Sequence, residues 1–147
     1  MVAKVFPKGH IDQGKPTNFK EKILAGEKTT TIRCNYRLWK KRMDNVDEGQ
    51  AIIEFREWEG KPYRSKQIPF ASICNGIISQ ILLDHRFHEM YAYQEIEGDE
   101  HLYRLELPKI AEMDGLTLEQ FKSWFKSSQE LTRHPHIFFG HVTPIEK

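Results

Sequence analysis

Two apolar residues at helical spacing mark a short helix near the start of the chain. Phe19 and Ile23 lie four positions apart, so both side chains fall on one face of a helix. Asn18 in front of them is a typical N-cap, and Glu21 stands where a capping box places its acidic residue. Gly26 is typical of the position just after the last helical turn. These signals predict a helix between Asn18 and Gly26.

Most of the remaining apolar positions follow the pattern of strands, apart from a second helix near the C-terminus. Leu118, Phe121 and Phe125 form a helical apolar stripe, and Thr117 is a good N-cap for it. Alternating or β-branched runs bounded by turn residues predict strands at 28–33, 51–58, 63–70, 76–83, 91–96, 101–107 and 136–142. Helices at both ends of a run of antiparallel strands predict an α+β domain built on a small closed barrel.

The composition excludes several classes of protein. The chain has 147 residues, of which 39% are hydrophobic and 29% charged, which is not the profile of a disordered tail or a coiled coil. No apolar run approaches the ~18 residues that a membrane-spanning helix needs, and the first residues lack the apolar stretch of a signal peptide. The two cysteines cannot build a disulfide framework, which favours a reducing compartment. We therefore expect one cytoplasmic domain over residues 1–147, with no membrane partner.

The charge is distributed unevenly, and a basic, aromatic stretch at 36–42 is part of the imbalance. Residues 1–42 hold eleven of the 22 basic residues but three of the 21 acidic ones. In this stretch, which fits a loop or a short helical turn, Tyr36 and Trp39 are suited to stacking on unpaired bases, and Lys40 to binding phosphate. The alternatives are that the two halves neutralise each other within one fold, and that Trp39 packs into the core beneath a solvated basic loop.

The segment 28–33 is the best candidate for chemistry, because the chain has no phosphate loop, nucleophile elbow or paired-cysteine motif. In a regular strand Thr29, Thr31 and Arg33 share one face. If Ile32 on the other face packs into the core, these polar groups are left for water or a ligand. Three successive threonines are also what plain β-propensity produces, so the pattern leaves both interpretations open.

Two blocks of the sequence resemble a known family. Residues 23–33, ILAGEKTTTIR, are similar to the signature of the ASCH family, small PUA-like barrels related to RNA-binding domains. Residues 111–125, AEMDGLTLEQFKSWF, resemble the acidic residue and following helix near the C-terminus of that family. Its small bacterial members include amidohydrolases that remove the acetyl group from N4-acetylcytidine. The resemblance implies a PUA-like barrel of about six mostly antiparallel strands, acting without metal or cofactor on the linear amide of a modified nucleoside.

The resemblance also implies roles for individual residues. Lys28 matches the nucleophile of the amidohydrolases, Thr31 their proton acceptor, and Arg33 an arginine common to the motif that suits an anionic or carbonyl group. Thr29, on the same predicted strand face as Thr31 and Arg33, is expected to bind substrate with them. Asp114 stands where those enzymes have a glutamate acid, so its carboxyl group is shorter by one methylene, or roughly 1.5 Å. A lysine attacks a carbonyl carbon only when neutral, so this role requires a lowered pKa.

Strand geometry and the other side chains leave further alternatives. Lys28 and Thr31 would lie on opposite faces of a regular strand, so they converge only if Lys28 precedes the strand or sits at a bulge. The competing functions are a non-catalytic RNA-binding module and an RNA-cleaving protein. The spacing of the histidines does not favour a metal site, and Cys34 has no positioned histidine beside it. Four aromatic residues are interpreted as core or barrel-closing side chains: Trp58, Trp124, Phe138 and Phe139.

Overall fold

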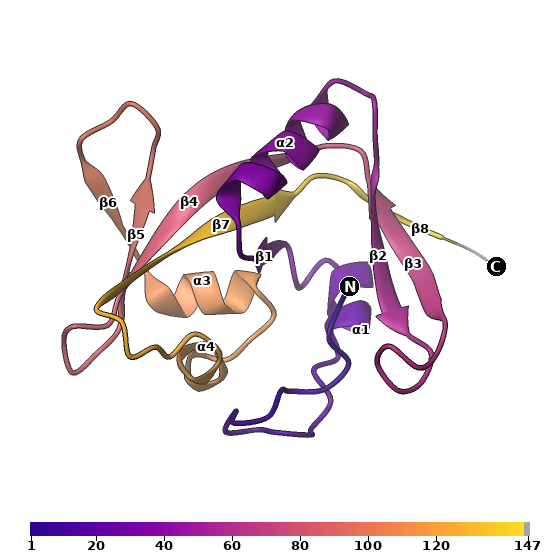
Figure 1. Cartoon of the computed structure of the whole chain (residues 1–147), viewed down its shortest axis with the longest axis horizontal. Coiled ribbons are helices and arrows are strands. Elements are labelled where there is room, and N and C mark those ends of the chain that lie inside the picture. The colour runs from indigo at the N-terminus through magenta and orange to yellow at the C-terminus, as the bar shows by residue number, and fades with distance from the viewer. Residues whose placement is uncertain (146–147) are drawn as a thin grey trace.

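The computed structural model describes residues 1–145, in which antiparallel strands form two sheets with short helices around them (Figure 1). This confirms the α+β prediction. One sheet has the order β1-β7-β4-β5-β6 and the other the order β2-β3-β8, and no closed barrel is found in the described part of the chain. The strands are β1 (Thr30–Ile32), β2 (Ile53–Trp58), β3 (Gln67–Ile73), β4 (Gly76–Asp84), β5 (Tyr91–Glu95), β6 (Leu102–Leu105), β7 (Leu131–Phe139) and β8 (Val142–Pro144).

The predicted first helix is present as α1 (Phe19–Leu24), and it ends as expected at Gly26. Gly26 has a φ of 76°, and its N–H donates to the carbonyl of Ile23 while the next N–H, of Glu27, donates to the carbonyl of Lys22. This pair of bonds is a Schellman motif, which satisfies carbonyls that the last turn leaves unpaired. The motif sets the direction in which the chain leaves α1 toward β1.

The predicted capping box of α1 is wrong. Asn18 has a φ of 58° and its side chain makes no capping hydrogen bond. The hydroxyl oxygen of Thr17 instead accepts a hydrogen bond from the N–H of Phe19 at 3.3 Å. Threonine and asparagine are both good helix caps, so residue type does not show which of these two neighbours bonds to the first turn.

The stretch at 36–42 is part of α2 (Tyr36–Asp47), a helix of 12 residues rather than a loop or a single turn. The side chain of Asn35 caps it by accepting from the N–H of Leu38 at 3.2 Å. The helix buries Met43 and Val46, and Met43 packs against Gly76 at the start of β4. These two apolar residues lie beyond residue 42, so the basic stretch viewed alone concealed the helical face.

The last predicted strand is divided between the two sheets. β7 begins at Leu131, five residues before the predicted start, and pairs with both β1 and β4. The chain then turns at Gly140, where an added Cβ would lie 1.9 Å from the side-chain oxygen of Asn75. After this turn β8 pairs with β3, so β7 and β8 join the two sheets.

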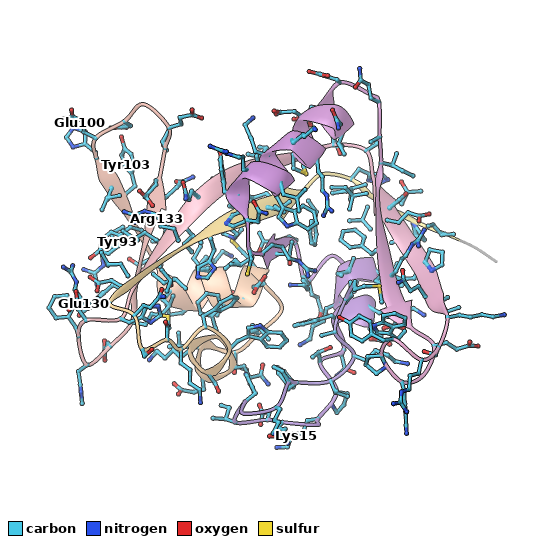
Figure 2. The ribbon with its side chains drawn as sticks, in the orientation of Figure 1. Lys15, Tyr93, Glu100, Tyr103, Glu130 and Arg133 are labelled. Atoms are coloured by element: carbon cyan, nitrogen blue, oxygen red, sulfur yellow. The ribbon has the colours of Figure 1, made fainter. Side chains whose placement is uncertain are left out.

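The β5–β6 hairpin was predicted, and it forms one edge of the larger sheet. It extends away from the rest of the sheet and carries Tyr93, Glu100 and Tyr103 (Figure 2). The guanidinium of Arg133 on β7 donates to the carboxylate of Glu95 at 2.9 Å, which ties the end of β5 next to the hairpin loop to the sheet.

Two helices connect the hairpin to β7. α4 (Leu118–Trp124) has the predicted Thr117 cap, completed by Gln120 as a capping box. α3 (Leu107–Met113) was not predicted; it begins where the strand predicted at 101–107 was to end, and Pro108 is favourable in its first turn. Figure 1 shows α3 and α4 on one side of β4 and β7, and α2 on the other. Within residues 1–145, no helix combines the length and apolar character needed to cross a bilayer.

Replacing Gly26 with alanine should lower the free energy of unfolding by about 1 kcal/mol, because the methyl group strains a left-handed backbone although nothing lies within 4 Å of it. Gly60→Ala is the matched control, since an added Cβ there meets Ser65 at an ordinary 3.6 Å. Urea denaturation of both variants measures the difference. Equal losses at the two positions would contradict the assigned conformation of Gly26.

Candidate functional site

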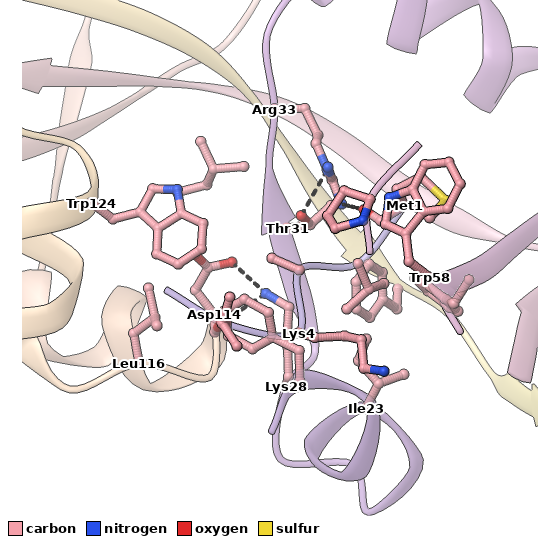
Figure 3. A pocket seen from close by; sticks show the side chains of 18 of the residues that line it. Met1, Lys4, Ile23, Lys28, Thr31, Arg33, Trp58, Asp114, Leu116 and Trp124 are labelled. Atoms are coloured by element: carbon pink, nitrogen blue, oxygen red, sulfur yellow. Dashed lines mark hydrogen bonds and ion pairs between the residues drawn. The ribbon is translucent and has the colours of Figure 1, made fainter. Parts of the chain in front are cut away.

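A cavity of about 530 Å³ opens between residues 1–5, α1, α4, β1 and the loop after β2. Much of its wall is aromatic, with Phe19 from α1, Trp124 from α4 and Trp58 from β2. Figure 3 shows Trp124 and Trp58 on opposite sides of the view, with the polar side chains between them. Its volume is in the range of small-molecule sites, and a few polar groups in an apolar wall are typical of such sites.

The most buried polar feature of this wall is an ion pair between Lys28 and Asp114, whose residues are 5% and 4% exposed. Lys28 Nζ donates to Asp114 Oδ1 at 3.0 Å, to the carbonyl of Asp114 at 2.7 Å and to the carbonyl of Thr30 at 2.8 Å. These bonds provide one acceptor for each N–H of an ammonium group. The structure thus brings together two of the three residues proposed for catalysis.

Two helix ends create this contact. Lys28 follows the Gly26 turn and precedes the first paired residue of β1, Thr30, so strand alternation does not turn it away from the cavity. Asp114 is the last residue before a second Schellman motif, in which Gly115 has a φ of 79°. A Cβ on Gly115 would lie 3.1 Å from the Cβ of Lys28, so the glycine also provides the space that the lysine occupies.

Burial shifts both members of the pair toward their neutral forms. Removal from water lowers the pKa of Lys28 and raises the pKa of Asp114, and the attraction between the two charges acts in the opposite direction on each. Arg33 and Lys22 lower the pKa of Lys28 further. The arrangement therefore favours exchange of one proton between the amine and the carboxylate.

Thr31 and Arg33 line the same cavity and contact each other. Arg33 Nε donates to Thr31 Oγ1 at 3.1 Å, and an Arg33 terminal nitrogen donates to the carbonyl of Met1 at 3.1 Å. Among residues 1–145 no carboxylate pairs with Arg33, and most of its N–H groups have no protein partner. A half-buried guanidinium of this kind is suited to an anionic or carbonyl group of a ligand.

The structure separates the other proposed substrate-binding residues from the cavity. Thr29 is exposed and lies in an outer groove, where its N–H donates to the carbonyl of Met113 at 2.8 Å. Tyr36 and Lys40 lie on α2 outside the cavity wall, and Lys40 Nζ pairs with Asp44 at 2.6 Å. Trp39, also on α2, lines two neighbouring spaces of about 340 and 40 Å³, and it shares the smaller one with Thr31 and Arg33. Thr29 precedes the first paired residue of β1, so it does not follow the alternation that places Thr31 and Arg33 at the cavity, and α2 carries Tyr36 and Lys40 away from it.

Trp58 and Trp124 were interpreted as core or barrel-closing residues, but both line the cavity. The Trp124 ring packs at 5.8 Å from Phe19 and at 5.7 Å from Phe6, which fixes one edge of the cavity. No signal in the sequence marked either position. Trp124 lies three residues after Phe121, next to the apolar stripe that predicts core packing, and a tryptophan in a strand is common in a core.

A second cluster of polar side chains lies buried in the larger sheet, next to the ion pair. Thr30 Oγ1, Ser79 Oγ and His136 Nε2 are buried without a hydrogen-bond partner in the described part of the chain. Ser79 faces His136 across β4 and β7, and Thr30 lies on the neighbouring strand. Burial, followed by the charge of Lys28, lowers the pKa of His136 to about 4. Within residues 1–145 no three His, Cys, Asp or Glu side chains gather into a candidate metal site.

Comparison with known proteins identified no matching family model, curated protein or solved structure.

His136 should make the protein less stable in mild acid. Its pKa in the folded state is about 4, against an ordinary 6.5, so the unfolded chain binds the proton more readily between these values. The free energy of unfolding should therefore fall by on the order of 3 kcal/mol as the pH drops from 6.5 to 4. Urea titrations of wild type and His136→Gln across this range should show a shallower dependence in the variant. His141→Gln, which removes an exposed imidazole, is the control. If the free energy of unfolding of His136→Gln fell with pH as steeply as that of wild type, the assignment to His136 would be refuted.

Proposed function

We propose that the chain is an ASCH-type, PUA-like domain whose cavity binds a nucleobase or modified nucleoside and hydrolyses an acyl amide on N4 of cytidine, without metal or cofactor. The observation that carries this proposal is the buried Lys28–Asp114 pair in the wall of an aromatic-lined cavity. The passage of the chain from β7 in one sheet to β8 in the other supports a barrel-like arrangement. The resemblance of residues 23–33 and 111–125 to the family supplies the substrate class.

The reaction begins with transfer of a proton from Lys28 to Asp114 along their 3.0 Å contact. The neutral amine adds to the acyl carbon, and the carbonyl electron pair moves to the oxygen. When the intermediate collapses, the C–N bond to the base breaks and Asp114 gives its proton to the departing amine. The proton of the attacking nitrogen passes to Asp114. Water then hydrolyses the acyl–lysine bond and releases the carboxylic acid, and the freed amine takes its proton back from Asp114.

Thr31 and Arg33 act on the carbonyl end of the substrate. Because Thr31 Oγ1 accepts a hydrogen bond from Arg33, its own proton is polarised and available to the developing oxyanion. This contact favours a donor role for Thr31 over the proton-acceptor role that the resemblance implies. The remaining N–H groups of Arg33 bind a carbonyl oxygen of the base or an anionic substituent.

The shorter acid at Asp114 fits this scheme because the backbone brings it close to the amine. Gly115 allows the end of α3 to approach Lys28, so an aspartate reaches Nζ at ordinary hydrogen-bond distance. A glutamate at the same position would extend past this contact toward the cavity. The length of the acid therefore sets how far from Lys28 a leaving amine can be protonated.

Purified protein should release cytidine from N4-acetylcytidine, and chromatography measures the cytidine released. Lys28→Met keeps the aliphatic stem and removes the nucleophile, so its turnover should fall by at least roughly a hundredfold. Asp114→Asn should lose turnover similarly, and Asp114→Glu should retain part of it. Lys15→Met removes an exposed amine outside the cavity and is the matched control. Thermal unfolding of each variant separates lost chemistry from lost folding, and turnover by folded Lys28→Met would disprove the mechanism.

The alternative is an RNA-binding module without catalysis, and the exposed side chains of Arg37, Lys41 and Arg42 on α2 favour it as the second candidate. In this case wild type would not hydrolyse N4-acetylcytidine, but it would bind single-stranded RNA with an affinity that falls steeply as salt rises. Replacing Arg37 and Lys41 with alanine should then remove two phosphate contacts, so the slope of log affinity against log salt concentration should become shallower by about 2. An RNA affinity that does not change with salt concentration, or no RNA binding at all, would eliminate this alternative.

A further inference from the structure

The loop between β2 and β3 holds a tyrosine in a conformation that suits glycine. Residues 61–64 form a turn in which the N–H of Arg64 donates to the carbonyl of Lys61 at 3.1 Å. Pro62 occupies the second position and Tyr63, with a φ of 63°, the third. A left-handed residue at the third position of such a turn is usually glycine or asparagine, because a bulky side chain there is strained.

Folding removes little of the surface of this tyrosine from water. Tyr63 is 90% exposed. Its ring contacts that of Trp58, with 5.1 Å between the centroids and 50° between the planes. Both rings belong to the wall of the cavity described above, as does Pro62. The strained backbone therefore holds an aromatic ring beside Trp58 at the cavity wall, where both rings are available to a ligand.

The loop does not depend on Tyr63 for its shape. Ser65 Oγ accepts from the N–H of Gly60 at 2.9 Å and donates to the carbonyl of Lys61 at 2.9 Å. The N–H of Glu59 donates to the carbonyl of Lys66 at 2.8 Å, which closes the base of the loop. These bonds involve backbone groups and a serine, so the side chain at position 63 can be changed without removing any of them.

We propose that Tyr63 and Trp58 form the surface on which the flat ring of the ligand stacks, so that Tyr63 determines affinity for the ring at the cavity mouth. This assignment rests on the proposed function and adds to it the residues that hold the base. A pyrimidine base meets both requirements of this wall, because its faces stack on aromatic rings and its carbonyl oxygen is an acceptor for Arg33, which lines the same cavity. Lys28 and Asp114 are left for the acyl group.

The test compares Tyr63→Gly and Tyr63→Phe with wild type, using N4-acetylcytidine. Glycine removes the ring and relieves the backbone, so Tyr63→Gly should melt at a higher temperature than wild type while its KM rises about tenfold. Its kcat should stay near the wild-type value, because Tyr63 is not assigned to the reacting groups. Tyr63→Phe keeps the ring and should keep the wild-type KM. A purely structural role would lower the melting temperature of the glycine variant instead.

Binding is measured separately from turnover, by titrating N4-acetylcytidine and following tryptophan fluorescence. An unchanged KM and affinity in Tyr63→Gly, with turnover intact, would overturn the stacking surface while leaving the reaction standing. Weaker binding in Tyr63→Gly than in wild type and Tyr63→Phe supports the surface, even if no variant hydrolyses the amide. Equal losses in the phenylalanine and glycine variants would overturn stacking, because the hydroxyl would then be the group that matters. Wild type that binds no N4-acetylcytidine would overturn both proposals.

Discussion

The buried pair of Lys28 and Asp114 is the constraint around which the cavity wall is built. Removing two charges from water costs several kcal/mol for each, and their attraction offsets this only when every hydrogen-bonding group is satisfied. Here the lysine satisfies its N–H groups with two backbone carbonyls and the carboxylate. Two helices must therefore end within a few ångströms of each other, and a left-handed glycine, Gly26 or Gly115, terminates each of them.

Stability alone is a poor explanation for such a pair. Well-packed apolar residues of similar volume are often as stable as a buried ion pair, or more stable. In this chain, buried polar groups also gather on the adjoining strands, where Thr30 and His136 have polar atoms without partners in the described part of the chain. A concentration of costly groups beside an aromatic cavity is typical of a site selected for chemistry, because the same burial that destabilises the charges makes the amine nucleophilic and the acid a proton donor.

The sequence predicted what depends on neighbouring residues and missed what depends on packing. Gly26 predicted a helix end, and the threonines of β1 predicted a strand. The local motif therefore placed Lys28, Thr31 and Arg33 near one another. It also included Thr29, whose opposite orientation follows from where pairing begins. Asp114 lies far along the chain and came from the family resemblance. The cavity positions of Trp58 and Trp124 depend on how three elements pack, which no local pattern encodes.

The two sides of the cavity differ in how firmly they are held, and this difference bears on how its specificity can change. The polar side is fixed by two Schellman motifs and by β1, so moving Lys28 or Asp114 would leave a buried charge without its partner. The aromatic side includes a surface loop whose backbone bonds persist whatever residue occupies position 63. Under the proposed function, substitutions there would alter contacts with the base at little cost to the fold. The proposed catalytic geometry and the proposed ring preference are therefore separable in this architecture, and a change of substrate would begin at the loop.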